Sequence, residues 1–246
     1  SDDIRRKLAL FCNVKQEAVI ESIDAETIYD VPLLMQKEGL DKVVLDTLKL
    51  SIPATADLEK WKSFLAKYKN PKQTIHVGLI GKYVELQDSY KSILEAIIHA
   101  GAVNETKVKV HSIHSEYLDE NDVAEKLKGL DGVIVAPGFG ERGIQGKIEA
   151  IHYVRENNIP FLGICLGMQM AVIEYARNVV GIKAANSTEM EEHCSEPVIS
   201  IMEEQKHIAD KGGTMRLGAW KCQLKKDSLA YNVYQSEAME ERHRHR

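Results

Sequence analysis

The sequence has no long apolar run and no excess of positive charge. No apolar stretch in its 246 residues approaches the roughly 18 residues that a membrane-spanning helix needs, and no signal-peptide pattern opens the chain. The net charge of −5 offers little attraction to nucleic acid or to an anionic membrane. We therefore expect neither nucleic acid nor membrane as a partner. The 44% of hydrophobic residues are enough to bury a sizeable core.

Cysteine is also scarce. The four cysteines, Cys12, Cys165, Cys194 and Cys222, are scattered, and no two of them have the paired spacing of a metal site. We therefore expect no bound metal in this chain. Few, unpaired cysteines fit a reducing compartment, so the expected location is the cytoplasm.

One cysteine lies in a stretch typical of a nucleophile elbow, FLGICLGMQMAVIEYA at residues 161–176. The apolar run 159–164 meets Cys165 between Gly163 and Gly167, and an apolar, helix-compatible segment follows. In such an elbow the nucleophile sits on a strained turn between a strand and a helix. The helix N-terminus stabilises a thiolate and offers backbone N–H groups to an oxyanion. A buried structural cysteine is the alternative, because Cys is often core, but the two glycines favour the nucleophile.

A second glycine-rich stretch, GFGERG at residues 138–143, allows three interpretations. It matches G-x-G-x-x-G, but a dinucleotide site needs an acidic residue at the end of the next strand, and that strand ends in Cys165. It could also be an ordinary glycine turn. We favour an oxyanion loop, in which the backbone N–H near Gly138 acts together with that of Leu166.

From residue 74 onward, strand and helix patterns alternate. Strands are predicted at 74–80, 107–113, 132–135 and 159–164, and helices at 89–100, 123–128 and 147–157. This alternation predicts an α/β fold with a mostly parallel sheet and helices on both faces. Gly138 and Cys165 then follow the carboxyl ends of strands, where such sheets place their sites.

Residues 1–70 have a different pattern. Helices are predicted at 4–11, 25–38 and 58–68, with a linker at 51–56. No strand run long enough to build a sheet is present there. We therefore expect residues 1–70 to be a mainly helical segment and residues 71–246 to form the α/β domain.

Several stretches together carry a resemblance that spans nearly the whole chain. They are FCNV (11–14), GLIGKYVELQDSYKS (78–92), APGFGERG (136–143), GICLGMQ (163–169), ANSTE (185–189), GGTMRLG (212–218) and EERHRHR (240–246). The elbow motif is similar to that of class I, triad-type glutamine amidotransferases, and the full set resembles the CTP synthase family. The resemblance implies flavodoxin-like layering, and it makes residues 1–70 the tail of a ligase domain plus an interdomain linker.

The resemblance also implies roles for individual residues. Cys165 would be the nucleophile, and the N–H groups of Gly138 and Leu166 would form the oxyanion hole. Glutamine would be bound by Gly138, Leu166, Gly167, Met168, Gln169, Glu189 and Arg246. In this family Glu189 holds the α-amino group of glutamine, and Arg246 pairs with its α-carboxylate. From the residues alone, Asn186–Glu189 is an ordinary turn or capping sequence, and the basic run 242–246 is a solvated face.

The activity implied by the resemblance is hydrolysis of glutamine through a thioester, with the ammonia used in ATP-dependent amination of UTP to CTP. The family further implies ATP and Mg²⁺ on the ligase domain, GTP as effector and a homotetrameric parent. Its general base is a His in a His-Pro-Glu motif, and none of the nine histidines here is followed by Pro-Glu. We therefore expect this chain alone to be inactive. The alternatives are another α/β hydrolase with a Cys elbow, and a non-catalytic module that binds glutamine or an effector.

Overall fold

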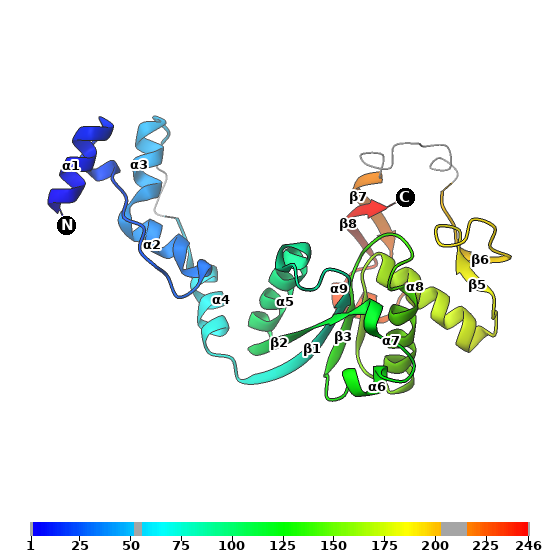
Figure 1. Ribbon diagram of the computed structural model, residues 1–246. Coiled ribbons are helices and arrows are strands. Elements are labelled where there is room, and N and C mark those ends of the chain that lie inside the picture. Colours follow the sequence, from blue (N-terminus) through cyan, green and yellow to red (C-terminus); the bar gives the residue numbers. More distant parts are fainter. Residues whose placement is uncertain (1, 52–55, 203–215, 246) are drawn as a thin grey trace. The chain divides into compact units, whose positions relative to one another are not determined.

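The computed structural model describes residues 2–51, 56–202 and 216–245, which form two compact units (Figure 1). The first unit comprises Ser1–Thr74 and Glu95–Val108, and the second comprises Ile75–Leu94 and Lys109–Arg246. The N-terminal unit thus ends close to the predicted boundary at residue 70. It also includes a stretch, Glu95–Val108, that the sequence pattern assigned to the α/β domain. Most of the predicted linker at 51–56 lies outside the described residues.

Helices make up most of the first unit. They are α1 (Asp2–Cys12), α2 (Val31–Glu38), α3 (Leu40–Thr47), α4 (Glu59–Lys69) and most of α5 (Lys91–Val103). The predicted helix at 25–38 is wrong in its first residues. Thr27 instead caps a 3-10 turn, Ile28–Asp30, through a hydrogen bond to the N–H of Tyr29. Pro32 then sits in the first turn of α2, where its missing N–H costs nothing.

An aromatic cluster around Tyr29 holds the first unit together. The Tyr29 ring is buried and meets the rings of Trp61, Phe64 and Tyr68 edge-on, at centroid distances of 5.9, 5.2 and 5.4 Å. Its hydroxyl donates to a carboxylate oxygen of Glu95 and lies 3.1 Å from Nε2 of His99, both on α5. Burial, together with the Glu95 carboxylate, raises the pKa of Tyr29 to about 12. This cluster explains why Glu95–Val108 belongs to the first unit.

The second unit is built on a four-stranded sheet in the order β2-β1-β3-β4 (Figure 1). The strands are β1 (Gln73–Gly81), β2 (Thr106–His114), β3 (Gly132–Val135) and β4 (Phe161–Gly163). β3 pairs in parallel with β1 and with β4. This order agrees with flavodoxin-like layering, so the predicted α/β class with a mostly parallel sheet is confirmed. β4 is the last strand of this sheet, and Phe161 and Leu162 on it are exposed.

Helices cover both faces of the sheet. Successive residues of a strand point to opposite faces, so neighbouring residues of β1 and of β3 pack into two different hydrophobic clusters. On one face, Ile80, Val133 and Val135 pack with side chains from α6 (Val123–Lys126), α7 (Ile144–Glu156) and α8 (Leu166–Tyr175). On the other face, Leu79 and Ile134 pack with Tyr90 and with Ile93 and Leu94 of α5. Figure 1 shows these helices beside the strands.

Further elements follow the sheet in the chain. They are the π-helix Ala176–Val180, β5 (Ala185–Ser187), β6 (Glu196–Ile199), β7 (Arg216–Gln223), α9 (Leu229–Tyr234) and β8 (Ala238–His245). β5 pairs with β6, and β7 forms an antiparallel pair with β8 in which Trp220 lies opposite Glu241. Within the part of the chain that the structure describes, no helix has the length and apolar character needed to span a bilayer.

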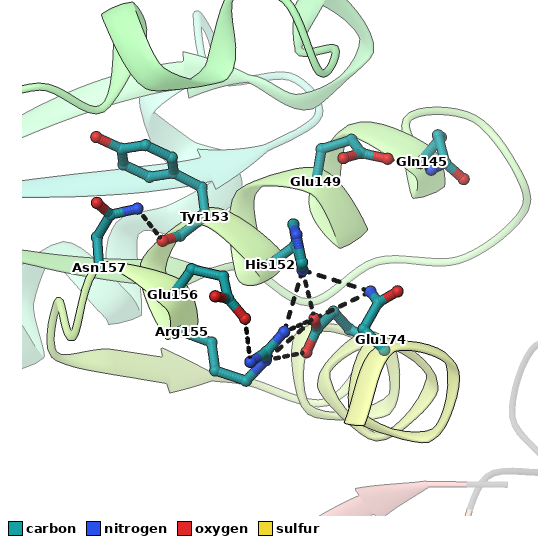
Figure 2. A network of polar contacts seen from close by, with 9 residues as sticks. Gln145, Glu149, His152, Tyr153, Arg155, Glu156, Asn157 and Glu174 are labelled. Atoms are coloured by element: carbon teal, nitrogen blue, oxygen red, sulfur yellow. Dashed lines mark hydrogen bonds and ion pairs between the residues drawn. The ribbon is translucent and has the colours of Figure 1, made fainter. Parts of the chain in front are cut away.

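A buried carboxylate joins α7 to α8, as Figure 2 shows. Glu174 is 1% exposed, and its oxygens accept hydrogen bonds from Nε and Nη2 of Arg155 at 2.9 to 3.1 Å. His152 Nδ1 lies 2.9 Å away, and Asn178 donates at 3.1 Å. Burial is the largest single influence on the pKa of Glu174 and acts upward. The hydrogen bonds from Arg155, His152 and Asn178 together outweigh it and hold the pKa below its ordinary 4.5.

Arg155→Met is expected to lower the free energy of unfolding by about 2 kcal/mol, because it leaves a buried carboxylate short of its main partner. The surface variant Arg6→Met, which breaks an exposed pair with Asp3, should stay within about 0.5 kcal/mol of the original protein.

Since the folded pKa of Glu174 is lowered, its stabilising contribution exists above pH 4.5 and disappears as the pH falls through the lowered value. Urea titrations of both variants, at a pH above 4.5 and at a lower pH, measure these changes in the free energy of unfolding. An equal loss of stability in Arg155→Met and Arg6→Met would contradict the prediction.

Candidate active site

Cys165 occupies a strained backbone position between β4 and α8. Its φ is 53° and its ψ is −107°, and it caps the N-terminus of α8. Non-glycine residues rarely adopt a positive φ, and such strain gathers at functional sites. The side chain is exposed, so it is not the buried core cysteine of the alternative interpretation. Leu166 is the first residue of α8, and the first N–H groups of a helix have no acceptor within it.

The glycines on both sides of Cys165 are required by close backbone contacts. A Cβ on Gly167 would lie 2.1 Å from the carbonyl oxygen of Val135 at the end of β3. A Cβ on Gly163 would lie 2.6 Å from the carbonyl carbon of Gly167. The N–H of Ile164 also donates to the Val135 carbonyl at 3.0 Å. The first turn of α8 is therefore packed directly on β3, which fixes the position of the elbow.

The Gly138 loop lies next to the elbow. It follows β3, and a Cβ on Gly138 would be 3.5 Å from Cδ2 of Leu166, an ordinary contact. The fold itself therefore leaves room for a Cβ at Gly138. Glycine is required further along the loop, at Gly140 and Gly143, where φ is +74° in both cases. At Gly143 a Cβ would also lie 2.4 Å from Oγ of Ser115.

Two buried lysines bind this loop, and the sequence analysis missed both. Lys147 on α7 is 0% exposed, and its Nζ donates to the carbonyl of Ala136 at 2.9 Å. Lys82, directly after β1, is 8% exposed and donates to the carbonyl of Phe139 at 2.7 Å. The sequence contained one indication of this: Ile151 and Val154 follow Lys147 by four and seven residues, which places all three on one face of the helix. A lysine on an apolar face either extends to solvent or has a buried partner.

The other predicted site residues differ in their surroundings. Gly167 and Leu166 are buried, Met168 is 50% exposed, and the N–H of Gln169 donates to the Cys165 carbonyl at 3.1 Å. Glu189 follows β5 and is exposed, with its N–H donating to Oγ of Ser187. Among the described residues, no hydrogen bond or ion pair joins Glu189 to the elbow. Arg246 and the 212–215 part of GGTMRLG lie outside the described residues.

A histidine–carboxylate pair is present, but it does not serve Cys165. His152 and Glu174 form the pair shown in Figure 2. Glu174 lies nine residues after the cysteine, on the helix that the cysteine caps. At 1.5 Å per residue this corresponds to about 13 Å along the axis, well beyond hydrogen-bond reach. The pair therefore acts as a structural link between α7 and α8.

Comparison with known families agrees with this geometry. Residues 85–246 match the model described as glutamine amidotransferase class-I. The chain belongs to this family. Residues 1–50 match a second model, described as the N-terminus of CTP synthase. The class-I amidotransferase match covers β3, the Gly138 loop, the elbow and every site residue proposed from the sequence.

Curated relatives match the amidotransferase chain over its whole length. A CTP synthase of Flavobacterium psychrophilum is 69% identical over 246 residues, and one of Bacillus subtilis is 51% identical over 246 residues. In both cases the match covers 100% of this chain and 46% of the relative, so the chain spans about half the length of these proteins. The glutaminase domain of a Trypanosoma brucei CTP synthase, solved with bound acivicin, has a TM-score of 0.64 and 37% identity. That match covers 70% of this chain and 67% of the trypanosome chain.

Proposed function

We propose that the chain is the glutamine-hydrolysing part of a CTP synthase, with Cys165 as its nucleophile. The observation that carries the proposal is the exposed Cys165 at φ 53°, held by Gly167 against β3 and beside the Gly138 loop. An exposed thiol at a helix N-terminus has the environment of a reactive cysteine. The similarity to CTP synthases over the whole chain supports the same function.

In the proposed reaction the thiolate of Cys165 attacks the side-chain amide carbon of glutamine. A C–S bond forms, and the carbonyl oxygen becomes an oxyanion that accepts hydrogen bonds from the N–H groups of Gly138 and Leu166. The intermediate then collapses with loss of the C–N bond, and the protonated nitrogen leaves as ammonia. Water attacks the resulting thioester, which releases glutamate and restores the thiol.

The other groups of the proposal complete this scheme. Met168, Gln169 and Glu189 are proposed to contact glutamine together with Gly167, and Arg246 to pair with its carboxylate. The proton acceptor is proposed to be the His of a His-Pro-Glu motif carried by the intact protein outside this sequence. ATP, Mg²⁺ and UTP belong to the ligase part in this proposal, with GTP as effector of a cytoplasmic homotetramer.

Incubation of the intact protein with glutamine is expected to add a γ-glutamyl group to Cys165, because the thioester is an obligatory intermediate of this mechanism. Rapid acid quenching followed by mass spectrometry of the Cys165 peptide detects it, and ammonia release is measured in parallel. Asparagine, one methylene shorter, serves as the control substrate. Ammonia release without acylation of Cys165, or acylation of Cys12, Cys194 or Cys222 instead, would contradict the assignment.

A further inference from the structure

Two ammonium groups hold the Gly138 loop at carbonyls on either side of Gly138. Lys147 donates to the carbonyl of Ala136 at 2.9 Å, and Lys82 donates to that of Phe139 at 2.7 Å. A Cβ placed on Gly138 would lie 3.7 Å from Nζ of Lys147. The Lys147 ammonium therefore lies directly beside the residue whose N–H is proposed to stabilise the oxyanion.

The hydrogen bond from Lys147 acts on a short segment with little remaining freedom. The peptide between Ala136 and Pro137 has no N–H, and the proline ring fixes φ at about −65°. Once the Ala136 carbonyl points toward α7, the orientation of the Gly138 N–H depends on few torsions. With Lys82 holding the Phe139 carbonyl, this N–H lies between two fixed peptide groups. Such preorganisation is what an oxyanion donor needs.

Burying a lysine is unfavourable for the fold. Lys147 is 0% exposed, and transfer of an ammonium from water to a protein interior carries a large desolvation cost. Burial above all, and then the Lys82 ammonium, lower the pKa of Lys147 to about 8, while negative charge at Cys165 acts in the opposite direction. A methionine of similar length would avoid this cost but would leave the buried Ala136 carbonyl without the Lys147 donor. The hydrogen bond to the Gly138 loop is therefore what a lysine provides at this position.

We infer that Lys147 is a positioning residue of the proposed glutaminase site: its hydrogen bond to the Ala136 carbonyl orients the Gly138 N–H for the oxyanion. The inference rests on the proposed function. The charged and titratable groups around Lys147 are Lys82 after β1 and Cys165 at the elbow, with Arg142 and Glu116 acting on Lys82. Because the pKa of Lys147 is about 8, its charge is present at pH 7 and is lost above pH 8.

The test is Lys147→Met in the intact protein, with the exposed Lys128→Met as matched control. At pH 7, hydrogen exchange of the peptide that carries the Gly138 N–H is expected to become about tenfold faster, because the Ala136 carbonyl loses its anchor. The kcat for glutamine should fall about tenfold with little change in KM, as expected for a group that acts in the transition state. Lys128→Met should change none of these.

A purely structural role of Lys147 predicts a different result. An unchanged exchange rate of the Gly138 peptide, or a fall in kcat/KM that comes entirely from a raised KM, would overturn the inference. If the methionine variant does not fold, Lys147→Gln, whose shorter side chain withdraws the donor from the Ala136 carbonyl, is measured in the same way. Faster exchange then supports the anchoring of the loop by Lys147, and an unchanged rate overturns it. If the original protein does not hydrolyse glutamine, the proposed function fails, while the exchange comparison still decides whether Lys147 holds the loop.

Discussion

Cys165→Ala in the intact protein is expected to lower glutamine-dependent turnover by about 10⁴-fold or more, because removal of a nucleophile disables the whole catalytic unit. CTP formation from free ammonia should survive, since that route needs no thioester. Steady-state assays with glutamine and with ammonium chloride as nitrogen sources measure the two activities. Cys12→Ala is the control, because Cys12 is also exposed but lies on α1 of the first unit.

The variant Cys165→Gly separates the chemical from the conformational role of this position. Glycine adopts the φ of 53° without strain, whereas alanine keeps the strain. Cys165→Gly is therefore expected to be as inactive as Cys165→Ala but more stable by about 1 kcal/mol. Loss of both the glutamine and the ammonia activities in these two variants, with a normal melting temperature, would mean that the cysteine acts in the ligase reaction instead.

Gly167→Ala is expected to lower the free energy of unfolding by about 3 kcal/mol, because overpacking against rigid backbone is not easily relieved. The new Cβ would lie 2.1 Å from the oxygen and 2.8 Å from the carbonyl carbon of Val135. Neither atom belongs to a flexible side chain, so α8 must move away from β3. We expect glutamine-dependent activity to fall with stability, since the movement displaces Cys165 and the Leu166 N–H. Urea denaturation and the glutamine assay measure these effects.

Gly132→Ala provides the matched control for this prediction. Gly132 is the first residue of β3, and its Cβ would be 3.5 Å from the carbonyl oxygen of Pro160, an ordinary contact. A change of less than about 1 kcal/mol is expected there. Similar losses at the two glycines would show a general intolerance of a Cβ at buried glycines, and would contradict a specific contact between α8 and β3.

The elbow and the sheet were predictable because their signals are local. Apolar runs separated by helical patterns predicted the four strands of the main sheet, β1 to β4, but not β5 to β8. The two glycines around Cys165 predicted a tight turn whose contacts the structure then supplies. The boundaries of the last strand were less accurate. β4 begins at Phe161 rather than at residue 159, because Pro160 has no N–H to donate and Asn158 has a φ of 54°.

Features that depend on distant residues could not be predicted. Tyr29 is 66 residues from Glu95 and 70 from His99, so nothing in the local pattern indicates that Glu95–Val108 packs with the first unit. The helix predicted at 147–157 begins earlier, since α7 spans Ile144–Glu156. In the structure Gly146 lies inside the helix, where a Cβ would be 2.0 Å from the carbonyl oxygen of Ser115. Lys147 follows it, and its burial depends on a carbonyl eleven residues away.

The aromatic cluster around Tyr29 also gives the first unit its own fluorescent reporter. The sequence has two tryptophans. Trp61 donates to the Tyr29 carbonyl at 2.8 Å within the first unit, and Trp220 lies on β7 in the second. In a Trp220→Phe variant, tryptophan emission excited at a wavelength that tyrosine does not absorb reports on the first unit alone, and Trp61→Phe isolates the second. Unfolding of the helical segment and of the amidotransferase unit can therefore be followed separately in one protein, without an attached dye.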